Sequence, residues 1–326
     1  MTSVTTGFFL HPASSLHDTG WSHPEHQGRL RALASTVGKD LLTLYGHVGQ
    51  LEPSLADEDD LLRVHSRSQV EQVYRACKMA ETRETIVSLD ADTKVSGASW
   101  EAALGSAGAG ITAARAIVQG DIRTAFVAAR PPGHHATPER SMGFCLFNNV
   151  AVTARWLQTM GHAERVLIVD WDVHHGNGTQ DAFYADPSVF FLSLHQSPHY
   201  PGSGAASETG AGSGEGTTLN VPLPAGTSRA EYLAAFDHAL ADAVGRFRPD
   251  FVLMSAGFDV LAGDPLGGMS LEPEDLHAMT RRVVEVGAEA CDERVIAFLE
   301  GGYDPKRLGA GAVAVVRALA DLEVPG

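Results

Sequence analysis

One short segment of the chain holds several side chains of the kinds that bind metals. Residues 170–177 read Asp-Trp-Asp-Val-His-His-Gly-Asn and follow an apolar run typical of a buried strand. Asp172 and His174 are two positions apart, so an extended backbone points both side chains the same way. A third ligand must come from elsewhere, and Asp259, which follows another apolar run, is the best candidate. Two carboxylates and one imidazole leave a position open on zinc, which is typical of a catalytic site.

A pair of adjacent histidines, His134 and His135, follows the sequence Pro-Pro-Gly. Proline restricts the backbone, so this approach is expected to fix both imidazoles. Paired histidines beside a metal suggest acid–base catalysis, and each imidazole needs an orienting partner on its second nitrogen. Asp170 and Asn177 are the nearest polar candidates for that task.

The elements that must position these residues are alternating strands and helices. Runs of β-branched and aliphatic residues predict buried parallel strands at residues 124–128, 165–170, 189–194, 251–255 and 295–299. Amphipathic patterns predict helices at residues 100–118, 148–158, 228–247, 272–290 and 305–322. Ser228 and Glu231 form a capping box at the start of one of these helices. The alternation predicts βαβ units, and we expect one α/β domain over residues 1–326 with a central parallel sheet flanked by helices.

Four polar clusters fall just after predicted strands, where parallel sheets bind ligands. These clusters are residues 130–135, residues 170–177, residues 257–259 and residues 300–303. We therefore expect them to converge on one site. The alternative, in which Asp172 caps a helix and Asp259 lies in a turn, leaves the histidine pair and Tyr303 at matching strand ends without a role.

Composition restricts the class of protein. The chain has 24 basic and 40 acidic residues, a formal net charge of −16, and no Lys/Arg cluster, which argues against a nucleic-acid surface and suits a cationic substrate. No apolar run is long enough to span a membrane and residues 1–11 lack the features of a secretory signal, so we expect a cytoplasmic protein without membrane association. The three cysteines, Cys77, Cys145 and Cys291, are too widely spaced to predict disulfides or a cysteine-built zinc site.

Several common catalytic motifs do not occur in the sequence. The glycine-rich residues 202–216 match no phosphate-loop pattern, and we interpret them as a flexible loop at the rim of the site. The chain contains neither Gly-x-Ser-x-Gly nor His-Glu-x-x-His. These observations exclude the usual serine hydrolases and zinc proteases.

Six segments resemble the motifs of the histone deacetylase and acetylpolyamine amidohydrolase superfamily, in the family's order and over most of the chain. They are Arg130-Pro-Pro-Gly-His-His, Met142-Gly-Phe-Cys-Leu-Phe-Asn-Asn, Asp170-Trp-Asp-Val-His-His-Gly-Asn-Gly-Thr-Gln, Leu219-Asn-Val-Pro-Leu, Ser255-Ala-Gly-Phe-Asp and Glu300-Gly-Gly-Tyr. The Gly-Asn pair after His-His resembles the class II, bacterial-type branch. The resemblance implies the arginase/deacetylase α/β fold and a zinc-dependent deacetylase activity.

The resemblance also implies roles for single residues in the chemistry. The zinc ligands implied are Asp172, His174 and Asp259. The catalytic pair implied is His134, oriented by Asp170, and His135, oriented by Asn177, with Tyr303 polarising the substrate carbonyl. In the mechanism this suggests, His135 takes a proton from the attacking water and then protonates the leaving amine.

Further residues are implied to bind the substrate or a second ion. Gly143, Phe144 and Tyr200 would line a narrow channel for the acyl-lysine stem, and Asp92 would grip the substrate backbone at the rim. Family members also bind potassium, which here is expected near Asp170, Asp172, His174, Ser193 and Leu194. The binuclear arginases of the superfamily need additional aspartates where this chain has Gly176 and Leu261, so the resemblance favours a mononuclear deacetylase over a ureohydrolase.

The sequence leaves two other functions open. Polyamine-selective relatives carry an acidic residue at the channel mouth, and in one branch its position is that of Leu266, so leucine favours acetyl-lysine over acetylpolyamine. Glu25, Asp18 or an acid from a partner subunit of a homo-oligomer could still supply that charge. A non-catalytic acyl-lysine-binding protein is the other alternative, which the presence of Tyr303, both histidines and all three ligands disfavours.

Overall fold

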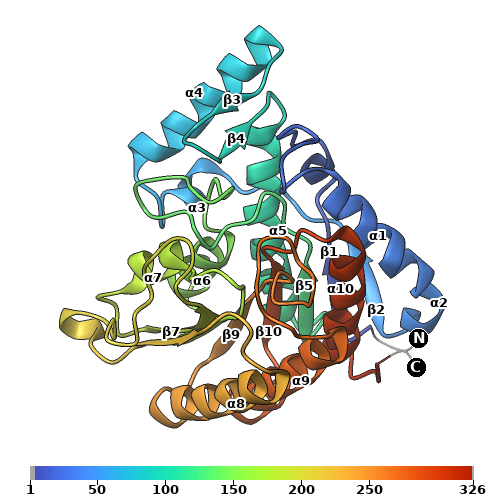
Figure 1. Ribbon diagram of the computed structural model, residues 1–326, viewed down its shortest axis with the longest axis vertical. Coiled ribbons are helices and arrows are strands. Elements are labelled where there is room, and N and C mark those ends of the chain that lie inside the picture. Colours follow the sequence, from blue (N-terminus) through green and yellow to red (C-terminus); the bar gives the residue numbers. More distant parts are fainter. Residues whose placement is uncertain (1–3, 325–326) are drawn as a thin grey trace.

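The computed structural model describes residues 4–324, and an eight-stranded parallel sheet forms its centre (Figure 1). The strand order is β2-β1-β5-β10-β9-β6-β7-β8. In sequence the strands are β1 (Thr6–Phe9), β2 (Val48–Leu51), β5 (Thr124–Val127), β6 (Val166–Asp170), β7 (Val189–Gln196), β8 (Thr218–Leu223), β9 (Phe251–Ala256) and β10 (Val295–Leu299). The central strands are buried on both faces, as expected for a parallel sheet between two layers of helices.

Alternate residues of the central strands enter two separate apolar cores. In β6, Leu167 and Val169 belong to one core, whereas Val166 and Ile168 belong to the other. The first core packs against α1 (Gly28–Lys39), α8 (Arg229–Arg246), α9 (Pro273–Cys291) and α10 (Pro305–Leu319). The second packs against α4 (Arg67–Arg83), α5 (Ser99–Gln119) and α6 (Asn149–Thr159). The apolar runs of the sequence are therefore strands that contribute to two cores at once.

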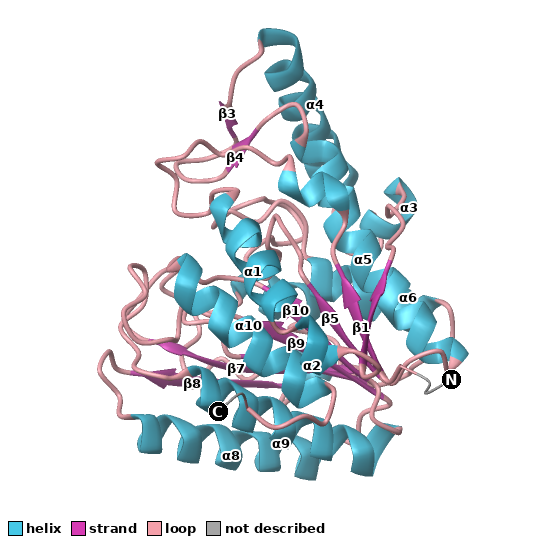
Figure 2. Cartoon of the chain, turned by 90° about the vertical axis from the view of Figure 1, so that its right-hand side faces the viewer, coloured by secondary structure: helices cyan, strands magenta, loops and turns pink. Residues whose placement is uncertain are grey.

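The remaining elements lie at the edges of this arrangement. The antiparallel pair β3 (Val87–Ser88) and β4 (Lys94–Val95) packs beside α4, and together they project from the body of the molecule (Figures 1 and 2). The short helices are α2 (Leu41–Leu44), α3 (Glu58–Leu61) and α7 (Asn177–Phe183). Helix α7 begins at Asn177, the last residue of the predicted metal-ligand segment 170–177. Among residues 4–324 no helix is both long and apolar enough to cross a bilayer.

The predicted elements are confirmed, with ends that differ by up to three residues. Ser228 and Glu231 form the expected capping box at the start of α8. Strands β1 and β2 and helices α1 and α4 were not predicted from the sequence, and the motif at residues 219–223 lies in strand β8, which was also not predicted. Helix α1 does carry Leu30 and Leu33 three positions apart on its buried face, so its pattern was present. The three cysteines are free and buried, as the wide spacing predicted.

Candidate active site

A cavity of about 530 Å³ opens at the carboxyl ends of the central strands. Loops after β5, β6, β7, β9 and β10 all contribute to its lining, so the predicted convergence of strand ends is present. The residues that line it are Asp92, His135, Gly143, Phe144, His174, Gln196, His199, Tyr200, Pro265, Leu266, Gly267, Gly268 and Tyr303. The three predicted metal ligands lie together at this end of the sheet.

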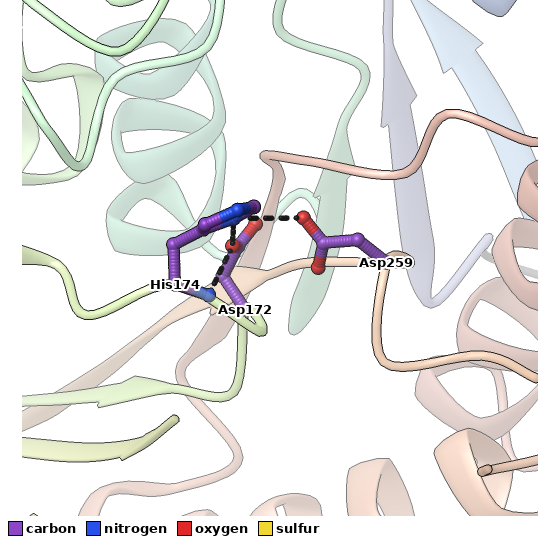
Figure 3. A group of neighbouring side chains, drawn as sticks. All are labelled: Asp172, His174 and Asp259. Atoms are coloured by element: carbon purple, nitrogen blue, oxygen red, sulfur yellow. Dashed lines mark hydrogen bonds and ion pairs between the residues drawn. The ribbon is translucent and has the colours of Figure 1, made fainter. Parts of the chain in front are cut away.

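Asp172, His174 and Asp259 form a compact triad (Figure 3). One potential ligand atom of each residue lies within 4.8 Å of those of the other two. Nδ1 of His174 is 3.0 Å from Oδ1 of Asp172 and 3.3 Å from Oδ2 of Asp259. The backbone fixes the carboxylates, because Asp172 accepts a hydrogen bond from the amide of Gly301 and Asp259 accepts one from the amide of Val173. The triad is thus held by parts of the chain far apart in sequence.

The donor set of the triad fits a divalent cation. Oδ2 of Asp259 is buried and accepts no hydrogen bond among the described residues; Nδ1 of His174, at 3.3 Å, forms an ion-pair contact with it. Burial and the neighbouring Asp172 carboxylate raise the pKa of Asp259 to about 7, which indicates a site short of positive charge. A Cβ on Gly301 would lie 2.0 Å from Oδ2 of Asp259 and 2.6 Å from Oδ2 of Asp172, so only glycine leaves this space open. Two carboxylates and one imidazole are ligands that suit zinc.

The two adjacent histidines after β5 contact the partners that the sequence predicted. Nδ1 of His134 lies 3.0 Å from Oδ2 of Asp170, and Nδ1 of His135 lies 2.8 Å from Oδ1 of Asn177. Both partners accept, so each ring donates through Nδ1. Nε2 of His135 is left free, whereas Nε2 of His134 lies 3.8 Å from Oδ1 of Asp172. The two rings are 4.0 Å apart between centroids. Of the pair, only His135 is in the cavity lining.

The surroundings give the two histidines opposite electrostatic properties. Burial alone would lower the pKa of His134, but the carboxylates of Asp172 and Asp170 outweigh it and raise this pKa to about 10. Burial lowers the pKa of His135 well below its usual value, and the charges of His134 and His174 act in the same direction. A histidine cation beside a neutral histidine is therefore the charge state that the geometry favours.

Tyr303 is the last cavity residue predicted for the chemistry, and the segment 300–304 positions it. The amides of Tyr303 and Asp304 both donate to Oδ2 of Asp264, at 2.6 and 3.2 Å. The Arg29 guanidinium lies 5.0 Å from the centre of the phenol ring. Burial raises the pKa of Tyr303 well above its usual value, although Arg29 opposes this shift. The phenol accordingly keeps its proton and can donate a hydrogen bond into the cavity.

Two buried acids lie behind the histidines and the tyrosine, where no role in holding the site was predicted for either of them. Glu300 accepts hydrogen bonds from the amides of Gly133 and His134, at 2.7 and 3.1 Å, and so joins the end of β10 to the histidine segment. Glu25 pairs with Arg29 and Arg130 at 3.0 and 2.7 Å, and all three side chains are fully buried. The motifs Arg130-Pro-Pro-Gly and Glu300-Gly-Gly-Tyr contained the signal, but their partners lie in distant segments.

The predicted channel residues surround the mouth of the cavity. Gly143 and Phe144 adopt positive φ angles of 54° and 69°, and the amide of Phe144 donates to Oγ1 of Thr93. A Cβ at Gly143 would lie 2.4 Å from the ring of His135, so the turn passes directly over that histidine. The ring of Tyr200 stands edge-on to that of His135 at 5.2 Å. These contacts fix two walls of the channel.

Asp92 and Leu266 complete the rim of the cavity, as the sequence interpretation expected. Asp92 is half-buried, and burial together with the nearby carboxylate of Asp90 raises its pKa. The backbone carbonyl of Asp92 accepts a hydrogen bond from Nε2 of His23 at 2.8 Å, which ties the rim to the segment before α1. Leu266 lies in the cavity lining on the loop after β9.

Glu25 and Asp18, the two acids of this chain considered for the channel mouth, do not line the cavity, and neither does the glycine-rich loop expected at its rim. Glu25 cannot supply an acidic group at the channel mouth, because it is fully buried and paired with two arginines. Asp18 is exposed and lines a different surface depression, next to Ser96 and Gly97. Residues 202–216 do not line the cavity. Gln180 on α7 and Asn220 on β8 bind Glu208 of this loop, which anchors it beside the sheet.

The side chains expected to lie near a potassium ion surround the end of β6. Asp170 is in register with Ser193 of β7, and both residues are fully buried. Oγ of Ser193 lies 2.9 Å from Nδ1 of His195, and Oδ1 of Asp170 accepts a hydrogen bond from the amide of Asp172. Leu194 follows on the same strand. The expected residues are thus neighbours.

The chain is similar to known deacetylases in sequence and in structure. The model of the histone deacetylase domain matches residues 23–319. "Histone deacetylase 10, chloroplastic" of Oryza sativa subsp. japonica is 41% identical over 307 residues, which cover 91% of this chain and 69% of that protein. A "Probable deacetylase" of Archaeoglobus fulgidus is 38% identical over 300 residues, covering 92% and 82%. The crystal structure of the HDA15 HD domain superposes with a TM-score of 0.91 at 35% identity, covering 99% of this chain and 90% of that one.

Proposed function

Because the chain belongs to the histone deacetylase family, we propose that it is a zinc-dependent hydrolase of the amide bond in N-acetyl-lysine or a related acyl-lysine. The observation that carries the proposal is the triad of Asp172, His174 and Asp259 at the end of a cavity that also contains His135 and Tyr303. We further propose that the whole chain forms one catalytic domain. All three cysteines are free and buried, which fits a reducing compartment such as the cytoplasm.

The three residues of the triad would hold one zinc ion. When bound, zinc supplies Lewis-acid polarisation of the substrate carbonyl and lowers the pKa of a water molecule toward about 7. The Oδ2 atom of Asp259, which accepts no hydrogen bond among the described residues, and the open space at Gly301 support this assignment. We also propose a potassium ion near Asp170, Asp172, His174, Ser193 and Leu194.

Proton transfer in this scheme is the task of His135. Its lowered pKa keeps the ring neutral, and its hydrogen bond to Asn177 leaves Nε2 free to accept a proton from the attacking water. The same nitrogen then protonates the leaving amine. His134, held by the carboxylate of Asp170, lies beside it, and a positive charge on this ring would stabilise negative charge in the transition state.

Tyr303 is assigned the role of stabilising the oxyanion that develops on the substrate carbonyl. Its raised pKa keeps the phenol protonated, so the hydroxyl can donate a hydrogen bond to the carbonyl oxygen as that oxygen gains charge. The backbone amide contacts with Asp264 hold the tyrosine segment in place before substrate binds. Prepositioned donors of this kind typically contribute a factor of about 10² to 10³ in rate.

Phe144 and Tyr200 would enclose the four-carbon stem of the lysine, and Asp92 would bind the peptide backbone at the rim. The position of Leu266 and the burial of Glu25 favour acyl-lysine over acetylpolyamine, because they leave the second amine of a polyamine without those partners. The test is kcat/KM of zinc-loaded enzyme for an acetyl-lysine peptide, acetylputrescine and acetylspermidine. A higher value for the peptide supports the proposal, and a higher value for either polyamine contradicts it.

A further inference from the structure

His199 lies in the cavity wall and has no part in the chemistry described above. Its ring stacks on that of the proposed zinc ligand His174, with centroids 4.8 Å apart and 17° between the planes. Nε2 of the same ring lies 2.9 Å from the carbonyl oxygen of Leu266. A carbonyl can only accept a hydrogen bond, so Nε2 must carry the proton and donate it. The side chain of His199 thus connects the metal-ligand triad to the loop after β9.

The loop after β9 is fixed by hydrogen bonds on both sides of Leu266. The amide of Leu266 itself donates to Oδ1 of Asp264 at 2.9 Å. The amide of Gly268 donates to Oε1 of Gln196, and its carbonyl accepts from the amide of Gly226, both at 2.8 Å. The bond from His199 secures the carbonyl of Leu266, at the part of the loop that faces the cavity.

The segment that carries His199 is itself restricted. Pro198 and Pro201 limit the backbone on either side of the residue. The next residue, Tyr200, places its ring edge-on to His135 at 5.2 Å. Consecutive residues therefore contact two different histidines of the site, and the position of the His199 ring is set both by its backbone and by its own two contacts.

We propose that His199 is a specificity-determining residue, which holds the Leu266 loop against the cavity and limits the size of the acyl group that the site accepts. The inference rests on the proposed function, since it takes an acyl-lysine as the occupant of the cavity. The stacking on His174 places the ring beside the triad, at the depth where the acyl group is cleaved. Truncating the ring adds its volume to the cavity there and also frees Leu266.

The expected result for His199→Ala is a change of acyl preference with little change in kcat for the acetyl peptide. KM for an acetyl-lysine peptide should rise, because a small acyl group loses contacts in the widened pocket. The ratio of kcat/KM for butyryl-lysine to that for acetyl-lysine should rise about tenfold, the usual size of discrimination by one or two methylenes in an apolar pocket. A ratio within twofold of the wild-type value would overturn the inference.

Two conservative variants separate the contributions of the ring and of the hydrogen bond. His199→Phe keeps an aromatic ring over His174 but cannot donate to Leu266, whereas His199→Gln can donate but has no ring. The phenylalanine variant should keep the acetyl preference, and the glutamine variant should lose it. His238→Ala, at an exposed position on α8, is the matched control and should behave as wild type.

Amide hydrogen exchange of residues 264–268 measures how firmly His199 holds the loop, and it requires no catalytic activity. Exchange should be faster in His199→Ala and His199→Phe than in wild type and close to wild type in His199→Gln.

Binding of the acetyl- and butyryl-lysine peptides to zinc-free protein, followed by fluorescence anisotropy, gives their preference ratio independently of catalysis. A wild-type enzyme that hydrolyses neither peptide would contradict the proposed function. Unchanged exchange and an unchanged binding ratio would contradict the role of His199.

Discussion

The active site is built from two regions that are held in different ways. The first, here called the catalytic floor, consists of Asp170, Asp172, Asp259 and His134 with the carboxylate of Glu300 behind them. These side chains are buried, and backbone amides or neighbouring side chains hold them at the ends of adjacent strands.

The second region, here called the channel wall, consists of Asp92, Phe144, His199, Tyr200 and Leu266. Its residues come from loops, and Tyr200 remains 38% exposed. Contacts between loops hold it, such as those from His23 to the rim and from His199 to Leu266. The difference suggests a division of tasks, in which the floor together with His135 and Tyr303 sets the rate of the chemical step and the wall sets which substrate reaches it.

The largest effect should follow from damage to the metal triad. Asp259→Asn keeps the shape of the side chain but removes its charge, so the triad should lose affinity for zinc. We expect kcat/KM to fall by at least about 10³-fold, equivalent to about 4 kcal/mol. Bound zinc, measured by mass spectrometry of the purified protein, should fall in parallel. Asp292→Asn, at an exposed position after α9, is the matched control; equal activity in the two variants would place the metal elsewhere.

The proton-transfer and oxyanion residues of the site come next. Tyr303→Phe removes one hydrogen-bond donor, and we expect kcat to fall by about 10² to 10³. His135→Ala should cost about 10² to 10⁴ for loss of acid–base catalysis. In both variants KM and zinc content should stay near the wild-type values. A loss expressed mainly in KM would assign these residues to substrate binding, which is the task given to the channel wall, and would contradict their part in the chemical step.

Stability should depend on pH through His65, a buried neutral histidine that contacts the segment after the histidine pair. Nδ1 of His65 lies 3.0 Å from the carbonyl oxygen of Thr137, and its Nε2 accepts from the amide of Asn148. Burial lowers the pKa of His65 to about 4, from an ordinary value of 6.5. The unfolded chain therefore takes up the proton first, so this contribution is complete above about pH 6.5 and is lost as the pH falls toward about 4.

Urea unfolding at pH 7 and pH 5 measures this contribution. Wild type should lose roughly 2 kcal/mol more than His65→Gln between the two pH values, because only the histidine titrates. The other buried histidines are common to both proteins and cancel in this comparison. Equal losses of unfolding free energy in the two proteins would show that His65 is not held neutral in the folded state.

The smallest effect should come from the channel wall at Asp92. Asp92→Ala removes a charged acceptor at a half-exposed position, so we expect KM for an acetyl-lysine peptide to rise about tenfold with kcat nearly unchanged. Steady-state kinetics at saturating zinc provide the measurement. Should kcat fall as much as it does in Tyr303→Phe, the wall would take part in the chemical step and the two regions would not be separable.

The floor could be predicted from the sequence because strand ends determine it. Once β6 and β9 are recognised, the parallel sheet must bring Asp172 and Asp259 to one edge, and the spacing from Asp172 to His174 supplies the third ligand. The resemblance to the deacetylase motifs then implied the partners of His134 and His135, and the structure places those pairs at 3.0 and 2.8 Å.

The wall could be predicted only in part, because loops determine it. The family resemblance implied Phe144 and Tyr200 as channel residues. His199 was recognised only from the structure, where its ring stacks on His174 and its Nε2 donates to the carbonyl of Leu266, 67 residues away in sequence. The burial of Glu25 likewise depends on Arg130, 105 residues further along the chain. No local pattern reports such contacts between loops, which explains why the sequence could not exclude Glu25 as an acid at the channel mouth.

The most direct test of this account is zinc titration of the metal-free wild-type protein with an acetyl-lysine peptide as substrate. Acetate release should be absent without metal, rise in proportion to bound zinc and reach its maximum at one zinc per chain. Metal-free protein that releases acetate, or fully loaded protein that releases none, would contradict the assignment of Asp172, His174 and Asp259 as a catalytic zinc site.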